Sequence, residues 1–277
     1  MKFWQDYKQN LHTHSTWCDG RATPREMIER ALELGFDSLG FSGHTYMDYS
    51  DFLGKVTPET TAAYKKEVRA LKEEYRGIID IYLGLEFDVF STDDTSGLDY
   101  LIGGVHSIEA RDGSYIDFDG RVEFFRHAID EGCGGDEMEF VRRYYEAVRE
   151  LPKRRKCDII AHYDLVTKHS EKVKLFDEES AEYKKYALEA IEEISTKIPY
   201  FEINVGCIPR GYRSKPYPAP YLVKEMLAHG MGAVIGQDCH FPHMLGEAVD
   251  DGLELLRLVG AKEVFVLGDD GFYPMDI

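Results

Sequence analysis

The sequence has no long hydrophobic run and little basic charge for its length. No stretch approaches the roughly 18 apolar residues that a membrane-spanning helix needs, and the first ten residues contain no apolar signal core. Lysine and arginine total 33 against 51 acidic residues, which gives a formal net charge of −18. Proteins that bind a nucleic-acid backbone usually carry clustered Lys and Arg. Because this chain is strongly acidic, we expect no nucleic-acid partner. We therefore expect a soluble, cytoplasmic protein with no membrane partner.

The sequence also lacks the cysteine and glycine motifs that mark several classes of enzyme. Its 5 cysteines include no C-x-x-C pair, and an odd number fits a reducing compartment better than a disulfide framework. No Walker-type glycine loop is present, and no nucleophilic Ser, Cys or aspartyl-phosphate motif stands out. Cys18 and Cys239 each neighbour a candidate metal ligand, but we expect them to pack as small residues beside a crowded site. We therefore expect no covalent enzyme intermediate.

Short apolar runs alternate with longer helical patterns, which is typical of strand–helix units around a mainly parallel sheet. Strands are expected at residues 8–14, 38–42, 78–87, 100–105, 157–161, 200–205 and 233–236. Helices are expected at 24–34, 57–75, 137–150, 178–196 and 220–229, with a final helix and the apolar run 263–267 at the end. No linker or repeat stands out, so we expect one α/β unit over residues 1–277. A long insert at about 108–156 is expected to form a lid or wall.

Two histidines and a carboxylate lie within residues 11–20, which read LHTHSTWCDG. Side chains alternate across the faces of a strand, so His12 and His14 point the same way and could share one metal ion. Asp19 follows just past the predicted strand. Neutral imidazole nitrogens are good ligands for zinc, iron or manganese, and carboxylate oxygens complete the shell. This stretch therefore predicts a transition-metal site.

Residues of metal-ligand type also follow nearly all of the other predicted strands. In barrels of alternating strands and helices, the C-terminal ends of the strands converge on one face, so these side chains are expected to meet. The expected ligands are His12, His14, Asp19, His44, Glu86, His106, His162, Asp238 and His240. Such a set would serve three divalent ions, zinc, manganese or iron, at about three or four protein ligands each.

The order and context of these residues resemble the polymerase and histidinol phosphatase (PHP) family over nearly the whole chain. The shared motifs are His-x-His with a trailing Asp-Gly, Ser-Gly-His (His44), Leu-Glu-Phe-Asp (Glu86), Gly-Val-His-Ser (His106), Ala-His-Tyr-Asp (His162) and Gln-Asp-Cys-His (Asp238, His240). The long insert and the run Glu202-Ile-Asn204 before Arg210 are most similar to the histidinol-phosphate phosphatase branch. Relatives of that branch often have Ser-Asp-Ala-His where this chain has Gln-Asp-Cys-His.

The resemblance implies a distorted (β/α)7 barrel with a trinuclear metal centre. By analogy, one ion would be held by His12, His14, Glu86 and Asp238. Glu86 would bridge to a second ion, held also by His106 and His162. The third ion would be held by Asp19, His44 and His240. The residues by themselves do not divide the ligands among the ions.

Clustered divalent ions suit the hydrolysis of phosphate monoesters, which is among the slowest uncatalysed biological reactions. A water shared by two ions about 3.5–4 Å apart becomes hydroxide near neutral pH, while the ions neutralise charge on the phosphoryl oxygens and the leaving alkoxide. We expect in-line attack by that hydroxide, with Glu86, His106 and Asp238 at the catalytic centre. The resemblance implies that the substrate is L-histidinol phosphate, hydrolysed to L-histidinol and phosphate in histidine biosynthesis.

Positioning a phosphate ester needs cationic donors, and an arginine fork matches the phosphate group. Arg210 is the first candidate, and Arg213 and Lys215 lie on the same segment. Trp17 and Phe241 each lie near a candidate ligand and could wall an organic pocket. Glu109, Asp117 and Glu202 could meet an ammonium or imidazolium group, but we favour a role as solvated or structural carboxylates for all three.

Two other functions stay open at this point. A PHP phosphoesterase could act on nucleotide 3′-phosphates or DNA ends, although the acidic charge counts against DNA. The other function is that of a metal-binding module that has lost catalysis. The presence of all nine expected ligands argues against it, because loss of activity usually leaves gaps in such a set. A structural zinc site would close with about four ligands instead of spreading many along the chain.

Overall fold

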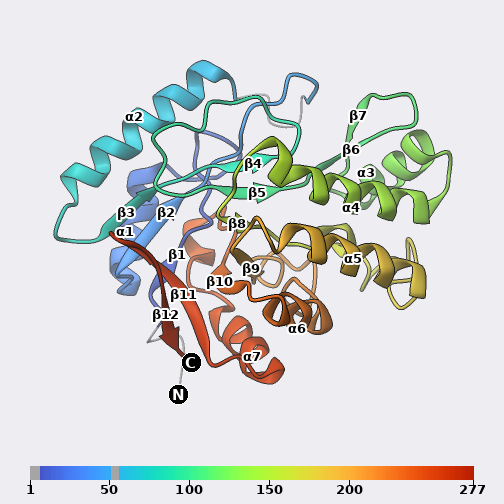
Figure 1. Ribbon diagram of the computed structural model, residues 1–277. Coiled ribbons are helices and arrows are strands. Elements are labelled where there is room, and N and C mark those ends of the chain that lie inside the picture. Colours follow the sequence, from blue (N-terminus) through green and yellow to red (C-terminus); the bar gives the residue numbers. More distant parts are fainter. Residues whose placement is uncertain (1–6, 51–55) are drawn as a thin grey trace.

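A ring of short parallel strands lies at the centre of the computed structural model, which describes residues 7–50 and 56–277 (Figure 1). The strands of this ring are β1 (Gln9–Asn10), β2 (Ser38–Phe41), β3 (Asp80–Leu83), β4 (Glu86–Asp88), β5 (Ile102–Gly104), β8 (Ile159–Ile160), β9 (Tyr200–Asn204) and β10 (Gly232–Gly236). They form two sheets, with the orders β1-β2-β3 and β10-β9-β8-β5-β4. All of these pairings are parallel.

The two sheets close into a barrel through isolated parallel bridges. Thr13 pairs with Cys239 at one junction, and His44 pairs with Glu86 at the other. Because β3 and β4 are two parts of one interrupted strand, the ring is the expected distorted (β/α)7 barrel. Helices cover its outside (Figure 1). They are α1 (Pro24–Leu34), α2 (Pro58–Glu74), α3 (Val122–His127), α4 (Glu137–Arg154), α5 (Ala181–Ile194), α6 (Pro220–Ala228) and α7 (Val249–Val259).

The helix boundaries follow signals that are legible in the sequence. Thr23 accepts a hydrogen bond from the backbone N–H of Glu26, whose side chain accepts one from Thr23 in return, and this capping box begins α1. Gly35 ends α1 with a φ of 77°, which glycine adopts without strain. Thr57 caps α2 in the same way. The expected helices are confirmed, and α4 runs past the expected end at residue 150 to Arg154.

Several predicted strands were too long, and two of them differ most from the structure. The strand expected at 8–14 reduces to β1. Beyond β1, the backbone carbonyl of Thr13 still accepts a hydrogen bond from the backbone N–H of Ser42 at 3.0 Å, as in a parallel sheet. The strand expected at 78–87 breaks into β3 and β4 at residues 84 and 85. We attribute this break to Tyr100, which fills the barrel interior beside it. The Tyr100 hydroxyl donates to the carbonyl of Leu11, and the Tyr100 ring lies so close to Gly84 that a side chain there would clash with it.

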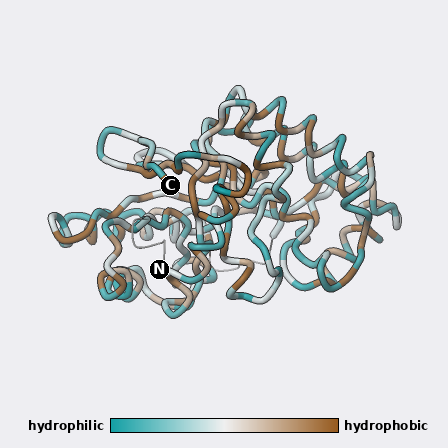
Figure 2. The backbone as a smooth tube through the Cα atoms, turned by 90° about the horizontal axis from the view of Figure 1, so that it is seen from below, coloured by the Kyte–Doolittle hydropathy of each residue, from teal (hydrophilic) through white to brown (hydrophobic). Residues whose placement is uncertain are grey.

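Apolar side chains fill the barrel on both sides of its strands. The interior cluster consists of Leu11, Tyr82, Tyr100, Ile102, Ile159, Ala161, Val234 and Leu267. A larger core lies between the strands and the surrounding helices. Figure 2 shows the hydrophobic residues gathered toward the middle of the molecule, with hydrophilic residues along the outer turns. This packing fixes the strand ends on which the candidate ligands lie.

Two antiparallel hairpins lie outside the barrel, and the sequence did not reveal either of them. One begins the 108–156 insert and pairs β6 (Ser107–Glu109) with β7 (Tyr115–Asp117). The other pairs β11 (Glu263–Gly268) with β12 (Gly271–Asp276), so the expected run 263–267 has a partner strand. The Gln9 side chain joins the second hairpin to the barrel, because it donates to the carbonyl of Leu267 and accepts from its N–H, both at 2.8 Å.

Within the described residues, no helix combines the length and the hydrophobicity that crossing a membrane requires.

Replacement of Gly84 by alanine should destabilise the barrel. A Cβ there would lie 2.5 Å from Cζ of Tyr100, so the ring would have to shift within a filled interior. Overpacking of this kind costs about 1–3 kcal/mol of unfolding free energy, measurable by chemical denaturation. Gly43→Ala is the matched control, since its Cβ would meet its nearest neighbour, Sγ of Cys18, at 3.5 Å. Equal stability of the two variants would contradict this account of the strand break.

Candidate metal centre

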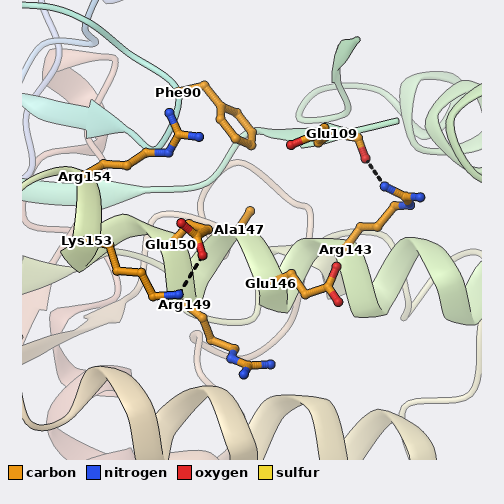
Figure 3. Close-up of a pocket in the computed structure, with 9 residues that line it drawn as sticks. All are labelled: Phe90, Glu109, Arg143, Glu146, Ala147, Arg149, Glu150, Lys153 and Arg154. Atoms are coloured by element: carbon orange, nitrogen blue, oxygen red, sulfur yellow. Dashed lines mark hydrogen bonds and ion pairs between the residues drawn. The ribbon is translucent and has the colours of Figure 1, made fainter. Parts of the chain in front are cut away.

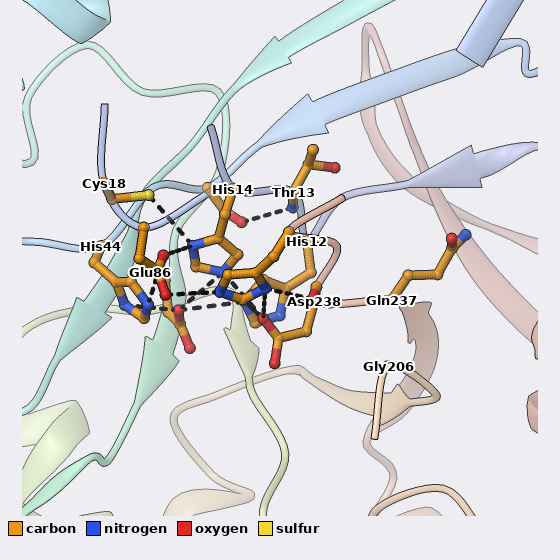
Figure 4. Close-up of polar contacts among 12 residues, drawn as sticks. His12, Thr13, His14, Cys18, His44, Glu86, Gly206, Gln237 and Asp238 are labelled. Atoms are coloured by element: carbon orange, nitrogen blue, oxygen red, sulfur yellow. Dashed lines mark hydrogen bonds and ion pairs between the residues drawn. The ribbon is translucent and has the colours of Figure 1, made fainter. Parts of the chain in front are cut away.

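The side chains predicted to bind metal converge at the C-terminal ends of the barrel strands. His12 and His14 follow β1, His44 follows β2, and Glu86 begins β4. Asp19 lies farther along the segment after β1. The remaining ligands follow β5 (His106), β8 (His162) and β10 (Asp238 and His240). Figure 4 shows His12, His14 and His44 arranged around Glu86, with Asp238 facing His12. The strand-end pattern in the sequence therefore corresponds to one cluster in space.

Glu86 lies at the middle of the cluster and is only 1% exposed. Its Oε2 atom lies 3.3 Å from Nε2 of His12, 3.5 Å from Nε2 of His14 and 3.0 Å from Nδ1 of His44. His12 and His14 flank the bridging residue Thr13, so they share a face as expected, with ring centroids 5.2 Å apart. One carboxylate oxygen thus faces three imidazoles.

The other oxygen of Glu86 faces two further histidines. Oε1 lies 3.2 Å from Nε2 of His106 and 2.9 Å from Nε2 of His162. Asp88, two residues after Glu86, contacts the far nitrogen of His106, with Oδ2 and Nδ1 3.2 Å apart. Asp88 also accepts from the backbone N–H of His106 at 3.1 Å. Such a partner fixes the ring so that Nε2 points at Glu86.

Asp19 and Asp238 complete the cluster on the opposite side from His106. Oδ1 of Asp238 lies 3.1 Å from Nε2 of His14 and 3.7 Å from Nε2 of His12. Oδ2 of Asp19 lies 3.0 Å from Nε2 of His240, and its Oδ1 lies 3.6 Å from Nε2 of His44. Asp238 adopts a φ of 46°, an uncommon backbone conformation that occurs often at functional sites.

The donor atoms fit divalent metal ions. Four groups have ligand atoms within 4.8 Å of one another, namely His14/Asp19/His44/His240, His12/His162/Asp238, His12/His14/Glu86 and His44/Glu86/His106. Several buried donor atoms in these groups have no hydrogen-bond partner among the described residues, including Nε2 of His12, Nε2 of His14, Oε2 of Glu86 and Oδ1 of Asp19. Buried polar atoms are normally satisfied, so a cluster of exceptions made of metal-ligand types indicates a metal site.

The groups agree in part with the division of ligands implied by the family resemblance. Asp19, His44 and His240 lie together, as expected for one ion, and His14 joins them. Glu86 lies within reach of ligands assigned to all three ions, and a carboxylate in that position could bridge ions as expected. His162 differs from the expectation, because it lies near His12 and Asp238 as well as near Glu86.

Glu202 holds two of the candidate ligands in place. Its Oε1 lies 2.7 Å from Nδ1 of His12, and its Oε2 accepts from the backbone N–H of His162 at 2.9 Å and from Nδ2 of Asn204 at 2.9 Å. A Cβ at Gly236 would lie 1.8 Å from Oε1, so a glycine is required beside it. Glu202 is buried behind His12, so it is a structural carboxylate, the favoured expectation, and does not face a substrate cation.

Opposite charges stabilise each other throughout the cluster. Burial lowers the pKa of His12, but the carboxylates of Glu202, Glu86 and Asp238 outweigh burial and raise it to about 10. Burial raises the pKa of Glu86, but the neighbouring histidines outweigh it and hold the pKa well below its usual range. The raised pKa of His12 favours its charged form when metal is absent, so binding of metal at His12 would displace a proton.

A cavity of about 330 Å³ opens directly onto the cluster. Its lining consists of Asp19, Arg21, His44, Glu86, His106, Asp119, Gly120, Lys168, Arg210, Tyr212, Asp238, His240 and Phe241. Arg210 and Phe241 lie there as expected. The Arg210 guanidinium donates to Oδ2 of Asp238 and, through Nε, to the carbonyl of Gly206 at 3.0 Å. The cavity is large enough for a small organic phosphate.

Several residues predicted to contact substrate lie elsewhere. The indole N–H of Trp17 donates to Oε2 of Glu67 on α2 at 2.7 Å, and Trp17 does not line the cavity. Lys215 is exposed and does not line it either. Arg213 donates to the hydroxyl of Thr167. These three predictions relied on proximity in sequence, which does not determine the direction of a side chain.

Sequence reasoning missed Lys168, a cation in the cavity wall. Lys168 is 5% exposed, and its Nζ lies 2.5 Å from Oδ1 of Asp119 and 4.5 Å from the centre of the Tyr212 ring. It lies six residues after His162, beyond the short helix Leu165–Thr167. A lysine shortly after a strand-end ligand was the available signal.

A second cavity, of about 480 Å³, lies outside the barrel between α4 and the residues Phe90 and Glu109 (Figure 3). None of its lining residues lines the first cavity. Its cations have partners within the protein: Arg143 donates to the carbonyl of Glu109, and Lys153 pairs with Glu150 at 2.7 Å. Glu109 therefore lies away from the candidate metal centre, as a solvated carboxylate would, and does not line the cavity where a substrate cation could meet it.

Comparison with known proteins gives consistent matches over most of the chain. A probable histidinol-phosphatase of Deinococcus radiodurans is 29% identical over 266 residues, which cover 91% of this chain and 94% of that protein. The histidinol-phosphatase of Bacillus subtilis is 27% identical over 278 residues, which cover 89% of this chain and 98% of that protein.

A solved structure shares the fold. The histidinol phosphate phosphatase of Lactococcus lactis, determined in complex with zinc, L-histidinol and phosphate, superposes with a TM-score of 0.70 at 20% identity. The match covers 96% of this chain and 98% of that one. The PHP domain family model matches residues 10–206, which contain most of the candidate ligands. With this match and the strand-end cluster together, the chain belongs to the PHP domain family.

Proposed function

We propose that the protein is a metal-dependent phosphatase that hydrolyses L-histidinol phosphate to L-histidinol and phosphate. The observation that supports this most is the buried carboxylate of Glu86, whose Oε2 atom accepts no hydrogen bond from the described residues. The imidazoles that face this carboxylate belong to His12, His14, His44, His106 and His162. The similarity to histidinol-phosphatases along almost the whole chain supports the choice of substrate.

The candidate ligands would hold three divalent ions, as zinc, manganese or iron. Bound ions would supply a nucleophilic water at neutral pH and would neutralise the charge on the phosphoryl oxygens. Glu86 would contribute ligand atoms to two of the groups and Asp238 to one, and Asp88 would hold the ring of His106 in its orientation. We assign the catalytic centre to Glu86, His106 and Asp238 on this basis.

The protein's own cations would position the phosphate. Arg210 reaches the cluster through its contact with Asp238, and Lys168 lies in the cavity wall near His106. Both are held by carboxylates, so they are directed before substrate arrives and lose little freedom on binding it. Tyr212 and Phe241 supply apolar wall area around the leaving group. The attacking water and the leaving alcohol would lie on opposite sides of the phosphorus.

Phosphate release from metal-loaded protein is the direct test. We expect a chelator-sensitive preference for L-histidinol phosphate over nucleotide 3′-phosphates and small sugar phosphates. The His106→Ala variant should lose at least about 100-fold in kcat, because a ligand to the reacting centre is removed. His229→Ala, at the surface, is the control. Preference for a nucleotide would discard the substrate and keep the metal-dependent hydrolase, whereas no release from any ester would overturn the proposed function.

Glu202→Gln should weaken metal binding without unfolding the protein. An amide oxygen can replace either Oε1, which contacts His12, or Oε2, which accepts from His162 and Asn204. Its NH₂ group would then face two N–H donors in the first case and Nδ1 of His12 in the second, where it removes the acceptor that orients the ring. Loss of such an outer partner typically lowers metal affinity by about 10–100-fold, measurable by competition with a chelator. Glu225→Gln is the matched control, because its carboxylate contacts His229 at the surface, 3.3 Å from Nε2. Equal affinities in the two variants would contradict a positioning role for Glu202.

A further inference from the structure

We propose that Asp119 binds the cationic group of the substrate's alcohol and makes the protein selective for phosphate esters of amino alcohols. This inference rests on the proposed function, which it deepens by assigning the residue that distinguishes a cationic ester from a neutral one. The substrate proposed above carries an ammonium group, so a site for it must include an acceptor of positive charge.

Asp119 is fixed at the edge of the candidate metal centre. It follows β7, and the backbone N–H groups of Phe118 and Asp119 both donate to the carbonyl of His106, at 3.0 and 3.3 Å. The next carbonyl, of Gly120, lies 2.8 Å from Nε2 of His169. The chain on both sides of Asp119 is therefore held, and its carboxylate faces the cavity beside His106.

The charges in the cavity leave one place for a cation. Among the described residues that line it, the acidic side chains are Asp19, Glu86, Asp119 and Asp238. All except Asp119 are candidate metal ligands, whose negative charge bound metal ions would neutralise. Lys168, Arg210 and Arg21 make the rest of the wall positive, which suits the phosphate group. An ammonium group would therefore be attracted to Asp119.

The contact with Lys168 leaves room for a second donor on Asp119. Lys168 contacts Oδ1 of Asp119, and no described residue is recorded as a partner of Oδ2. A carboxylate has about four lone-pair sites, so it can accept from a lysine and from a substrate ammonium at the same time. Lys168 would then remain free to direct its other N–H groups toward the phosphate.

Neither of the other acidic candidates can take this role. Asp117, two residues earlier, accepts from the hydroxyls of Ser50 and Ser107 and does not line the cavity. Glu202 is occupied by His12, His162 and Asn204. Asp119 was not among the acids that the sequence indicated, because nothing in its sequence context marks a carboxylate that faces the metal centre.

The test compares two substrates on metal-loaded Asp119→Asn protein. One is L-histidinol phosphate, and the other is a phosphate ester of a neutral alcohol, such as glycerol phosphate. We expect KM for the cationic ester to rise so that kcat/KM falls about tenfold or more, since a charged hydrogen bond is lost. We expect kcat/KM for the neutral ester to fall by a clearly smaller factor, which reflects only the loss of the charged partner of Lys168. Asp119→Glu should restore part of the preference, and Asp117→Asn should leave it unchanged.

The alternative is that Asp119 acts only by holding Lys168. In that case both esters would lose kcat/KM by the same factor, and this result would overturn the inference while leaving the proposed function intact. Unchanged kinetics on both esters would overturn it as well. A wild-type protein that shows no preference for the cationic ester would overturn the inference together with the proposed substrate. Thermal unfolding of each variant shows whether a loss reflects misfolding.

Discussion

The structure depends on placing a charged carboxylate, Glu86, inside a shell of five imidazoles at the end of a barrel. An isolated buried carboxylate would cost several kcal/mol, so the arrangement exists only because opposite charges surround it. Parallel strands supply those charges, since their C-terminal ends meet at one face. Most of the strands then contribute between one and three ligand-type side chains, and no single segment carries the site.

A second set of residues holds the imidazoles in the correct orientation. Glu202 contacts His12 and Asp88 contacts His106, each at the ring nitrogen away from Glu86. Gly236 and Gly84 make room for this arrangement, one beside Glu202 and the other beside Tyr100. The barrel interior and the candidate metal centre are therefore linked, because the same short strands carry the packing on one side and the ligands on the other.

The sequence alone predicted the parts of this molecule that have local signals. Thr23 and Gly35 marked the ends of α1, and the recurrence of ligand types after apolar runs located the cluster, His44 and Glu86 included. The residues that were missed, and the contact of Glu202 with His12, have no such signal. Lys168 and Asp119 meet across the cavity although 49 positions separate them in sequence, and Glu202 reaches His12 from 190 positions away. Trp17 was placed wrongly for the same reason, since a neighbour in sequence turned toward α2.

The most direct measurement is the metal content of the protein, combined with anomalous diffraction at the absorption edge of the bound element. The account predicts three ions per chain, all within the cluster around Glu86, and a loss of at least one ion in Glu86→Gln. That loss is expected because Glu86 belongs to two of the groups and its two oxygens face five histidines. Three ions retained in Glu86→Gln, or a single ion bound by one histidine pair in the wild-type protein, would contradict it.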